Sequence, residues 1–407
     1  MTEPSTASVT DGGPLAGIFE RMGAGGNPFP VFAMLRRTAP VLQFPGGAGF
    51  WGVFRYDDCV RILRDPVNFS SMVDALSMRG EKRPPTILFD DPPVHTRMRG
   101  LLSAAFTPRV VEEQADAIRE NATRMIAGML AEERPDLIAH LAYPLPVMVI
   151  AGMLGVQDGD MATFKRWSDA IIGNVGNSLI DPSNDAIADV NAEFDAYFRE
   201  RLARLRAAPE ENLLSELVNA VDEDGNRLST EDLLVVCRVL LVAGNETTTG
   251  LIVNAIRVFN EFKHVLPALR ERPALIPPMI EETLRYYPPF PATIRRTMRD
   301  MDVSGTVIPK DNRLLVMLAS ANHDETQFER PEEFIIERDP NRHLGFGMGI
   351  HYCLGAPLAR LEARIALEIL APRITDVVIE AAENDAVLRP GGPEKMFVRF
   401  EKAKIAA

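Results

Sequence analysis

The sequence predicts a mainly helical protein with a few small β-sheets. Through the middle of the chain, apolar residues recur three and four positions apart over long stretches, which is typical of amphipathic helices. Segments that alternate between apolar and polar residues are short. No internal repeat or low-complexity linker divides the 407 residues. We therefore expect a flexible tail at residues 1–12, followed by a single domain over residues 13–407.

The expected helices have recognisable signals. Residues 110–133 and 186–207 carry apolar side chains at helical spacing, with acids and arginines between them. Ser229 can cap a third helix, with Asp232 three residues later, and the helical pattern continues to about Phe262. At ~1.5 Å per residue this helix would be near 50 Å long. Because it is apolar on almost every face, it should be buried.

The most apolar stretch, residues 137–156, approaches the length of a membrane span. It contains Pro144 and Pro146, which interrupt a spanning helix, so we expect a buried helix preceded by an irregular segment. Short alternating runs predict strands at residues 49–54, 303–309, 313–319 and 395–402.

The composition excludes several classes of protein. The chain has 44 Lys and Arg against 57 Asp and Glu, a net charge of −13, which argues against a general nucleic-acid binder. Its cysteines, Cys59, Cys237 and Cys353, are too few for a disulfide scaffold or for a plant-type iron–sulfur site. The N-terminus lacks the basic and apolar regions of a signal peptide. We expect a soluble cytoplasmic protein without a membrane association.

The segment FGMGIHYCLG, residues 346–355, combines glycines with a single cysteine directly before the helical pattern APLARLEARIALEIL. Glycines let a backbone approach a flat ligand, and a helix N-terminus favours a thiolate. A thiolate in such a loop is a good ligand for haem iron. By themselves, the residues also allow Cys353 to be a core thiol, a zinc ligand together with His351, or a nucleophile.

This segment resembles the haem-binding loop of the cytochrome P450 family, Phe-x-x-Gly-x-x-x-Cys-x-Gly, in which Phe346, Gly349, Cys353 and Gly355 match. Three further motifs appear in the family's order between residues 90 and 364. The resemblance implies the family's fold, a large helical domain with small sheets. Haem b would lie between the long central helix and the helix after the cysteine loop. Cys353 would be the axial ligand, with Phe346 and Gly347 against the haem.

The second motif is AGNETT, residues 243–248, in the middle of the long helix. Without the resemblance, it is a polar kink in which hydroxyl groups bond to backbone carbonyls. The resemblance implies that Glu246 and Thr247 are the acid–alcohol pair over the haem. Thr247 would hold the oxygen species and its water, and Glu246 would relay protons for O–O cleavage.

The remaining motifs supply structural and cofactor contacts. Glu282 and Arg285 at i, i+3 would otherwise be an ordinary surface ion pair. The resemblance implies a buried cluster with Arg338 that supports the haem loop. In DDPPVHTRMRGLLSAAF, His95 and Arg99 share a helix face that could simply be solvated. The resemblance makes them ligands of a haem propionate, together with Arg295 and His351, and leaves open Arg296 in place of Arg295.

Substrate contacts are carried over from the family's substrate regions, which also include residues 72–88 and 167–175. Their aliphatic character favours a hydrophobic molecule, such as a terpenoid, steroid or fatty acid, over a small charged acid. Core packing is the alternative at each position. The individual residues are Leu88, Val242, Ala243, Thr293, Ile294 and Met396.

The resemblance predicts a haem-thiolate monooxygenase that uses O2 to hydroxylate an unactivated C–H bond. The chain has no dinucleotide-binding fingerprint and no fused iron–sulfur segment, so electrons would come from a separate ferredoxin and its NAD(P)H-dependent reductase. Arg109 and Arg360, on the side of the haem where Cys353 lies, would attract that acidic partner. We expect a monomer. The alternatives are a peroxide-driven peroxygenase, or a haem-thiolate sensor or binding protein, neither of which needs Glu246 and Thr247.

Overall fold

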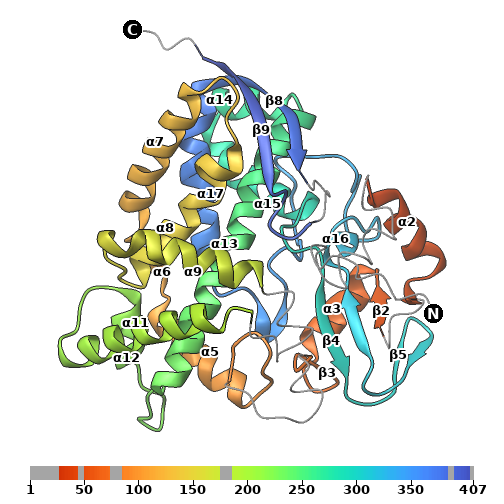
Figure 1. Ribbon diagram of the computed structural model, residues 1–407. Coiled ribbons are helices and arrows are strands. Elements are labelled where there is room, and N and C mark those ends of the chain that lie inside the picture. Colours follow the sequence, from red (N-terminus) through yellow and green to blue (C-terminus); the bar gives the residue numbers. More distant parts are fainter. Residues whose placement is uncertain (1–26, 45–49, 74–84, 175–185, 384–388, 404–407) are drawn as a thin grey trace, which may run out of the picture.

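The computed structural model describes residues 27–44, 50–73, 85–174, 186–383 and 389–403, and shows the expected mainly helical fold with small sheets (Figure 1). The predicted tail at residues 1–12 lies outside the described residues. The helices are α2 (Phe29–Thr38), α3 (Tyr56–Arg64), α5 (Val94–Ala105), α6 (Pro108–Glu112), α7 (Ala115–Ala131), α8 (Pro144–Met153), α9 (Met161–Gly173), α11 (Ala188–Ala207), α12 (Leu213–Asn219), α13 (Thr230–Glu261), α14 (Val265–Glu271), α15 (Ile276–Tyr286), α16 (Leu318–Ala321) and α17 (Ala356–Leu370).

The strands are short, apart from a hairpin near the C-terminus. They are β1 (Val41–Gln43), β2 (Phe50–Val53), β3 (Phe69–Ser70), β4 (Thr293–Thr297), β5 (Met301–Val303), β6 (Thr306–Ile308), β7 (Arg313–Val316), β8 (Ile374–Glu383) and β9 (Lys395–Lys402). Single turns of 3₁₀-helix are η2 (Asp158–Asp160), η3 (Pro273–Leu275), η4 (Gly349–His351) and η5 (Ala371–Arg373), and η1 (Ile138–Ala142) is a π-helix.

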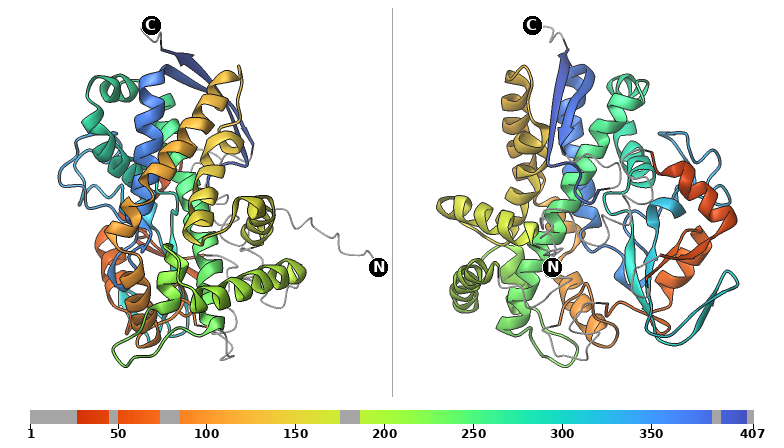
Figure 2. Two further views of the ribbon diagram at one scale, coloured as in Figure 1. Left: turned by 90° about the vertical axis from the view of Figure 1, so that its left-hand side faces the viewer. Right: turned by 45° about the vertical axis from the view of Figure 1, so that its right-hand side comes forward.

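The long helix α13 forms the centre of the molecule. Ser229 and Asp232 form the expected capping box at its start, and its 32 residues give a length of about 48 Å. It packs against α8, α9, α11, α15, α17 and β8. Figures 1 and 2 show it running through the molecule, with most helices on one side and the largest sheet on the other. Its length and hydropathy would suffice to cross a membrane, but 61% of that apolar stretch is buried, as in a core helix.

The helix α17 spans the predicted residues, Ala356–Leu370, with a proline in its first turn. It contacts α7, α13 and α15, and most of its surface is buried. Glu362 is only 1% exposed, and its Oε2 atom has no hydrogen-bond partner in the part of the chain that the structure describes. Burial raises the pKa of Glu362 well above its ordinary value. This helix therefore carries a carboxyl group that is more stable in its protonated form.

The five-stranded sheet joins distant parts of the chain, in the order β1-β2-β7-β4-β3. β2 pairs in parallel with β7, and β4 pairs antiparallel with β7. Two strand expectations are corrected here. The predicted strand 313–319 ends at Val316 and is followed by α16. The predicted strand 303–309 is interrupted by a turn at residues 304–305, so that Val303 ends β5 and residues 306–308 form β6 of a separate hairpin.

The C-terminal hairpin consists of β8 and β9, and β9 has the predicted bounds. Between them, Gly391 and Gly392 both have positive φ, 73° and 83°. This turn lies against α13, because a Cβ atom built on Gly392 would be 3.2 Å from Val253. The sequence analysis missed β8, as well as β1, β3 and β4.

Two helix expectations also change. The predicted helix 110–133 is divided into α6 and α7, which are separated by a turn at residues 113–114. The apolar stretch 137–156 is helical from Ile138, first as η1 and then as α8. Pro144 and Pro146 lie in the first turn of α8, where a missing N–H group costs little. The segment before α8 was expected to be irregular, but it is a short π-helix.

Candidate active site

The cysteine loop is a tight turn held by its own backbone. The N–H group of Cys353 donates to the carbonyl of Phe346 at 3.0 Å, and that of Gly347 donates to Leu344 at 2.8 Å. Gly349 has a φ of 74°, and a Cβ atom built there would be 2.2 Å from the carbonyl oxygen of Leu63. Only glycine fits this position. At Gly347, in contrast, a Cβ atom would meet nothing closer than the carbonyl oxygen of His351 at 3.9 Å, so this side of the loop is open to a flat group.

The thiol of Cys353 lies at the start of α17 and is surrounded by opposing influences. Burial raises its pKa, whereas hydrogen bonds from the backbone of Gly355 and Ala356 and the charges of Arg99 and Arg360 lower it. The net direction is upward, so the helix terminus alone does not produce the thiolate that the sequence suggested. A metal ion bound at this position would supply the missing positive charge, because metal ligation deprotonates a thiol.

Four basic side chains gather beside this loop. His95 and Arg99 come from α5, Arg295 from β4 and His351 from η4. The rings of His95 and His351 are 4.2 Å apart, and Arg295 is only 6% exposed. Burial, and then the charge of Arg295, lower the pKa of His351 to about 3, and burial lowers the pKa of Arg295 to about 10. The structure thus brings together the four predicted residues in a site that disfavours positive charge.

This cluster has polar atoms without protein partners. Both ring nitrogens of His95 and the Nε2 atom of His351 are buried without a hydrogen bond among the described residues. None of the four side chains forms an ion pair within the described ranges. The negative charge of Asp91 acts on Arg295, but its carboxylate accepts hydrogen bonds from Ser70 and Ser71. Buried polar atoms of this kind require hydrogen-bond partners. Two carboxylates, such as the propionates of haem, fit this donor set.

The structure also distinguishes the two adjacent arginines of β4. Arg295 lies on the face toward His351. Arg296 instead lies 3.7 Å from Asp311 and donates to the sulfur of Met298 at 3.6 Å. Successive side chains of a strand point to opposite faces, so only one of the two can join the cluster. That residue is Arg295.

The predicted structural cluster is present, and Glu282 and Arg285 within it are fully buried. Arg285 donates two hydrogen bonds of 2.8 Å to the carboxylate of Glu282, and both side chains are 0% exposed. Arg338 donates to the same carboxylate at 3.1 Å. Arg285 also binds the carbonyl of Asn322, and the side chain of Asn322 accepts from the N–H of Leu344 at 2.7 Å. The cluster is thereby connected to the start of the cysteine loop.

A second clamp on the cysteine loop was not predicted. Arg360 binds Glu281 through two hydrogen bonds of 2.7 and 2.8 Å, and its guanidinium group lies over the ring of Phe346 at 4.5 Å. The Nε2 atom of His343 is 3.1 Å from Glu281. Burial raises the pKa of Glu281, but Arg360 and His343 together lower it to about 2. Arg360, expected to be a free cation for a redox partner, therefore holds the loop.

The acid–alcohol pair lies on α13 as predicted. The hydroxyl of Thr247 donates to the carbonyl of Ala243 at 2.7 Å, which is the local bond expected of a helical threonine. Glu246 is half-buried, and burial raises the pKa of its carboxyl group, against the charge of Arg389. A raised pKa brings a carboxyl group closer to the range in which it exchanges protons at neutral pH.

The neighbouring residue Asn245 has a different environment. It is 0% exposed, donates to the hydroxyl of Ser168 at 3.3 Å, and accepts from Thr249 at 3.2 Å. The hydroxyl of Tyr143 continues this chain to Asp169, on the surface of α9. Asn245 therefore belongs to a structural hydrogen-bond network that is separate from the predicted pair, Glu246 and Thr247.

The predicted substrate contacts differ in their exposure. Ala243 and Leu88 are exposed, whereas Val242, Thr293 and Ile294 are half-buried. Met396 is 0% exposed in the main hydrophobic core, and its N–H group donates to Asp136 at 3.0 Å. The structure thus places Met396 in the packed core, the alternative for this position. Parts of the two predicted substrate regions, residues 74–84 and 175, lie outside the described residues.

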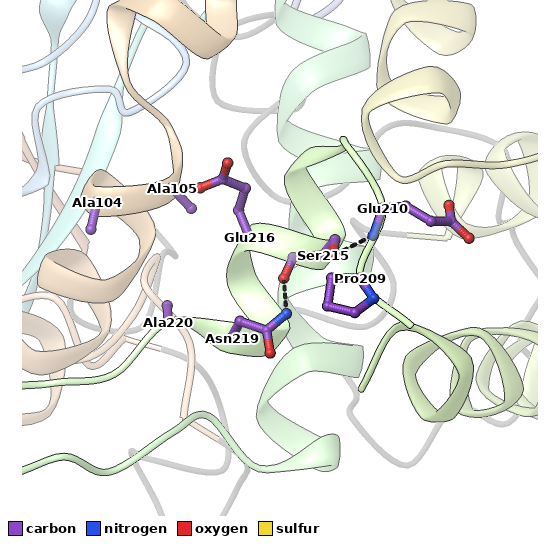
Figure 3. A pocket seen from close by; sticks show the side chains of 8 residues that line it. All are labelled: Ala104, Ala105, Pro209, Glu210, Ser215, Glu216, Asn219 and Ala220. Atoms are coloured by element: carbon purple, nitrogen blue, oxygen red, sulfur yellow. Dashed lines mark hydrogen bonds between the residues drawn. The ribbon is translucent and has the colours of Figure 1, made fainter. Parts of the chain in front are cut away.

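A groove of about 390 Å³ lies elsewhere, between the end of α5 and α12 (Figure 3). It contains none of the predicted site residues. Ser215 satisfies its polar neighbours, because it accepts from the N–H of Glu210 at 3.0 Å and from Asn219 at 2.9 Å. Two of the polar groups that line the groove are therefore already paired within the chain.

Comparisons with known proteins identify the family of this chain. The chain matches the family model for cytochrome P450 over residues 10–371. The putative cytochrome P450 YjiB of Bacillus subtilis (strain 168) is 39% identical over 368 residues, which are 89% of this chain and 91% of that protein. The cytochrome P450 monooxygenase PikC of Streptomyces venezuelae is 38% identical over 393 residues, 93% of this chain and 92% of that protein.

Solved structures give the same result. Cytochrome P450 CYP109Q5 from Chondromyces apiculatus has a TM-score of 0.83 at 38% identity, over 93% of this chain and 96% of that chain. CYP109E1 from Bacillus megaterium, solved in complex with testosterone, has a TM-score of 0.81 at 34% identity, over 92% and 99% of the two chains. The chain therefore belongs to the cytochrome P450 family, and it is a haem-binding monooxygenase with the mainly helical fold of that family.

Proposed function

We propose that His95, Arg99, Arg295 and His351 bind the haem propionates, that Cys353 is the axial ligand of the iron, and that Phe346 and Gly347 lie against the haem. The observation that carries this assignment is the set of buried histidine nitrogens without protein partners beside the cysteine loop. The trio Glu282, Arg285 and Arg338 supports the loop and takes no part in the chemistry. When bound, the haem supplies the activation of dioxygen and the insertion of one oxygen atom into the substrate.

The spectrum of the reduced protein with carbon monoxide tests the ligand. A thiolate ligand shifts the main absorption band strongly to the red, and Cys353→Ala should abolish that band. Cys59→Ala is the matched control, because Cys59 is another single buried thiol in a separate core. A Cys353→Ala protein that retained the red-shifted band would refute the assignment. For the propionates, Arg295→Met should weaken haem retention more than Arg296→Met.

We also propose roles for Glu246 and Thr247. The hydroxyl of Thr247 holds water and the oxygen species in place, and the carboxyl group of Glu246 exchanges protons with solvent. Thr247→Ala should leave haem binding unchanged but divert reducing equivalents from product to peroxide. Full coupling of electron consumption to product in this variant would contradict the role.

The proposed substrate is a medium-sized hydrophobic molecule that is hydroxylated at an unactivated C–H bond. Exposed or half-buried aliphatic side chains at Leu88, Val242, Ala243 and Ile294 suit such a ligand. Testosterone bound to CYP109E1 makes steroids the first class to test. Titration of the holoenzyme with testosterone, a terpenoid and a fatty acid should produce a low-to-high-spin shift with at least one of them. A shift only with small charged acids would refute the proposal.

Electrons would come from a separate ferredoxin and its NAD(P)H-dependent reductase. The enzyme would be soluble, cytoplasmic and monomeric, with one domain over residues 13–407. Arg109, 74% exposed, is a cation of the proposed docking face. Arg109→Glu should slow reduction by an acidic ferredoxin at low salt. Glu113→Gln is the matched control, because it removes the same ion pair without reversing the charge. Equal rates for the two variants would contradict this role of Arg109.

A further inference from the structure

The turn at residues 389–392, shortly before β9, lies on the central helix at the position of the predicted acid. The N–H group of Gly392 donates to the carbonyl of Arg389 at 3.1 Å, which closes the turn. Cβ atoms built on Gly250 and Gly392 show how closely the two segments pack, since the first would be 3.5 Å from the backbone of Gly391 and the second 3.2 Å from Val253. The turn therefore follows the surface of α13 over about two helical turns.

Gly391 makes the closest approach, and it meets Glu246. A Cβ atom on Gly391 would be 2.5 Å from the Cγ atom of Glu246 and 3.1 Å from its Oε1 atom. The φ of Gly391 is 73°, which side chains rarely adopt. The side chain of Glu246 thus occupies the space that a side chain at residue 391 would need. This contact fixes one side of the carboxyl group.

Arg389, at the start of the same turn, supplies a charge. It donates to the Oε1 atom of Glu394 at 3.0 Å, and its positive charge counters the effect of burial on the pKa of Glu246. The side chain of Arg389 is 35% exposed and that of Glu394 is 54% exposed. Arg389 therefore pairs with a carboxylate in solvent and carries its positive charge two residues from the glycine that contacts Glu246.

We propose that Arg389 and Gly391 are positioning residues for Glu246: the turn at Gly391 holds its carboxyl group against α13, and Arg389, two residues before that contact, is the cation of the same turn and pairs with the solvent-exposed Glu394. The C-terminal hairpin thereby becomes part of the proton-supply side of the active site. This inference rests on the proposed role of Glu246. It assigns no contact with substrate or haem to either residue.

A double-mutant cycle tests the proposal in the reconstituted holoenzyme, with product formed per NAD(P)H consumed as the measurement. Arg389→Met should lower this coupling several-fold, Arg389→Lys should restore most of it, and Gly391→Ala should have an effect similar to that of Arg389→Met. In a Glu246→Gln background, Arg389→Met should add no further loss. Arg399→Met is the matched control, because Arg399 pairs with Glu380 on the same hairpin.

The outcomes separate the two proposals. If Glu246→Gln itself leaves coupling unchanged, the proposed role of Glu246 fails, and this inference fails with it. If Glu246→Gln uncouples the enzyme but Arg389→Met equals Arg399→Met, only the inference is overturned. Additive losses in the double variant would also overturn it. A crystal structure of Arg389→Met gives a readout apart from activity, in which the carboxyl group of Glu246 should be displaced from its wild-type position.

Discussion

The clamp between Glu281 and Arg360 leads to a quantitative prediction for Glu281→Gln. The substitution keeps the shape of the side chain but removes the charge that Arg360 and His343 bind. In the folded protein the pKa of Glu281 falls from 4.5 to about 2, against the effect of burial. At ~1.4 kcal/mol per pKa unit this corresponds to about 3 kcal/mol. Because Glu281 and Arg360 remain 31% and 34% exposed, water screens the pair, and we expect a loss of about 2 kcal/mol.

The pH dependence has a defined sign. The pKa of Glu281 is depressed in the folded state, so its stabilising contribution is complete above a pH of about 4.5 and is lost progressively as the pH falls toward 2. The difference between wild type and Glu281→Gln in the free energy of unfolding should therefore be largest near neutral pH. It should narrow once the pH falls below about 4.5.

Urea denaturation of the holoenzyme measures this difference, and the reduced carbon monoxide spectrum reports on the loop. Glu281→Gln should unfold at lower urea and should lose its red-shifted band on mild heating sooner than wild type. Glu368→Gln is a matched control. Glu368 lies on α17, the helix that carries Arg360, and it is 30% exposed. Its carboxylate is 3.0 Å from Arg119 and 3.5 Å from Arg364. If both variants unfold at the same urea concentration and keep the same spectrum, the clamp does not stabilise the loop.

Three further predictions concern buried charge and the loop backbone. Burial raises the pKa of Glu362, so its contribution to stability is complete below about pH 4.5 and is lost as the pH rises. In urea denaturation, Glu362→Gln should therefore be more stable than wild type near neutral pH and equally stable at about pH 4.5; a variant less stable at both would refute this. Gly349→Ala should lose haem, since its Cβ atom would be 2.2 Å from a carbonyl oxygen, whereas Gly225→Ala, also at positive φ but in open space, should cost about 1 kcal/mol and retain haem. Arg285→Met leaves the carboxylate of Glu282 buried with one arginine fewer and should cost about 3–5 kcal/mol in urea denaturation; an unchanged urea midpoint would contradict this.

Local patterns predicted part of the fold well. The helix α17 and the strand β9 have the expected bounds. A proline two residues after Gly355 marks the start of α17, and alternation of apolar and polar residues marks β9. β4, with the sequence TIRRT, was missed because two adjacent arginines do not resemble a buried strand. Its place in the sheet depends on pairing with β7 and β3, which no local pattern encodes.

The site shows a similar division. Local sequence suggested a ligand role for Cys353, whereas the gathering of His95 and Arg295 was expected only from a family resemblance. The bond between Glu281 and Arg360 spans 79 residues, so that no spacing rule could indicate it. Gly391 had a visible signal, since it belongs to a pair of glycines, but a glycine pair predicts a turn and not the residue that the turn approaches.

The parallel pairing of β2 with β7 has a consequence for the synthesis of the chain. The side chain of Trp51 donates to Asn312 across 261 residues. At about 5–20 residues per second, β2 waits from roughly ten seconds to a minute on the ribosome before its partner strand has been made. Helices such as α7 and α8 meet neighbours close in sequence and can form meanwhile. The edge of β2 is therefore exposed during this interval, and Cys353, which follows β7, is completed later still, so a stable haem site forms only after synthesis of almost the whole chain.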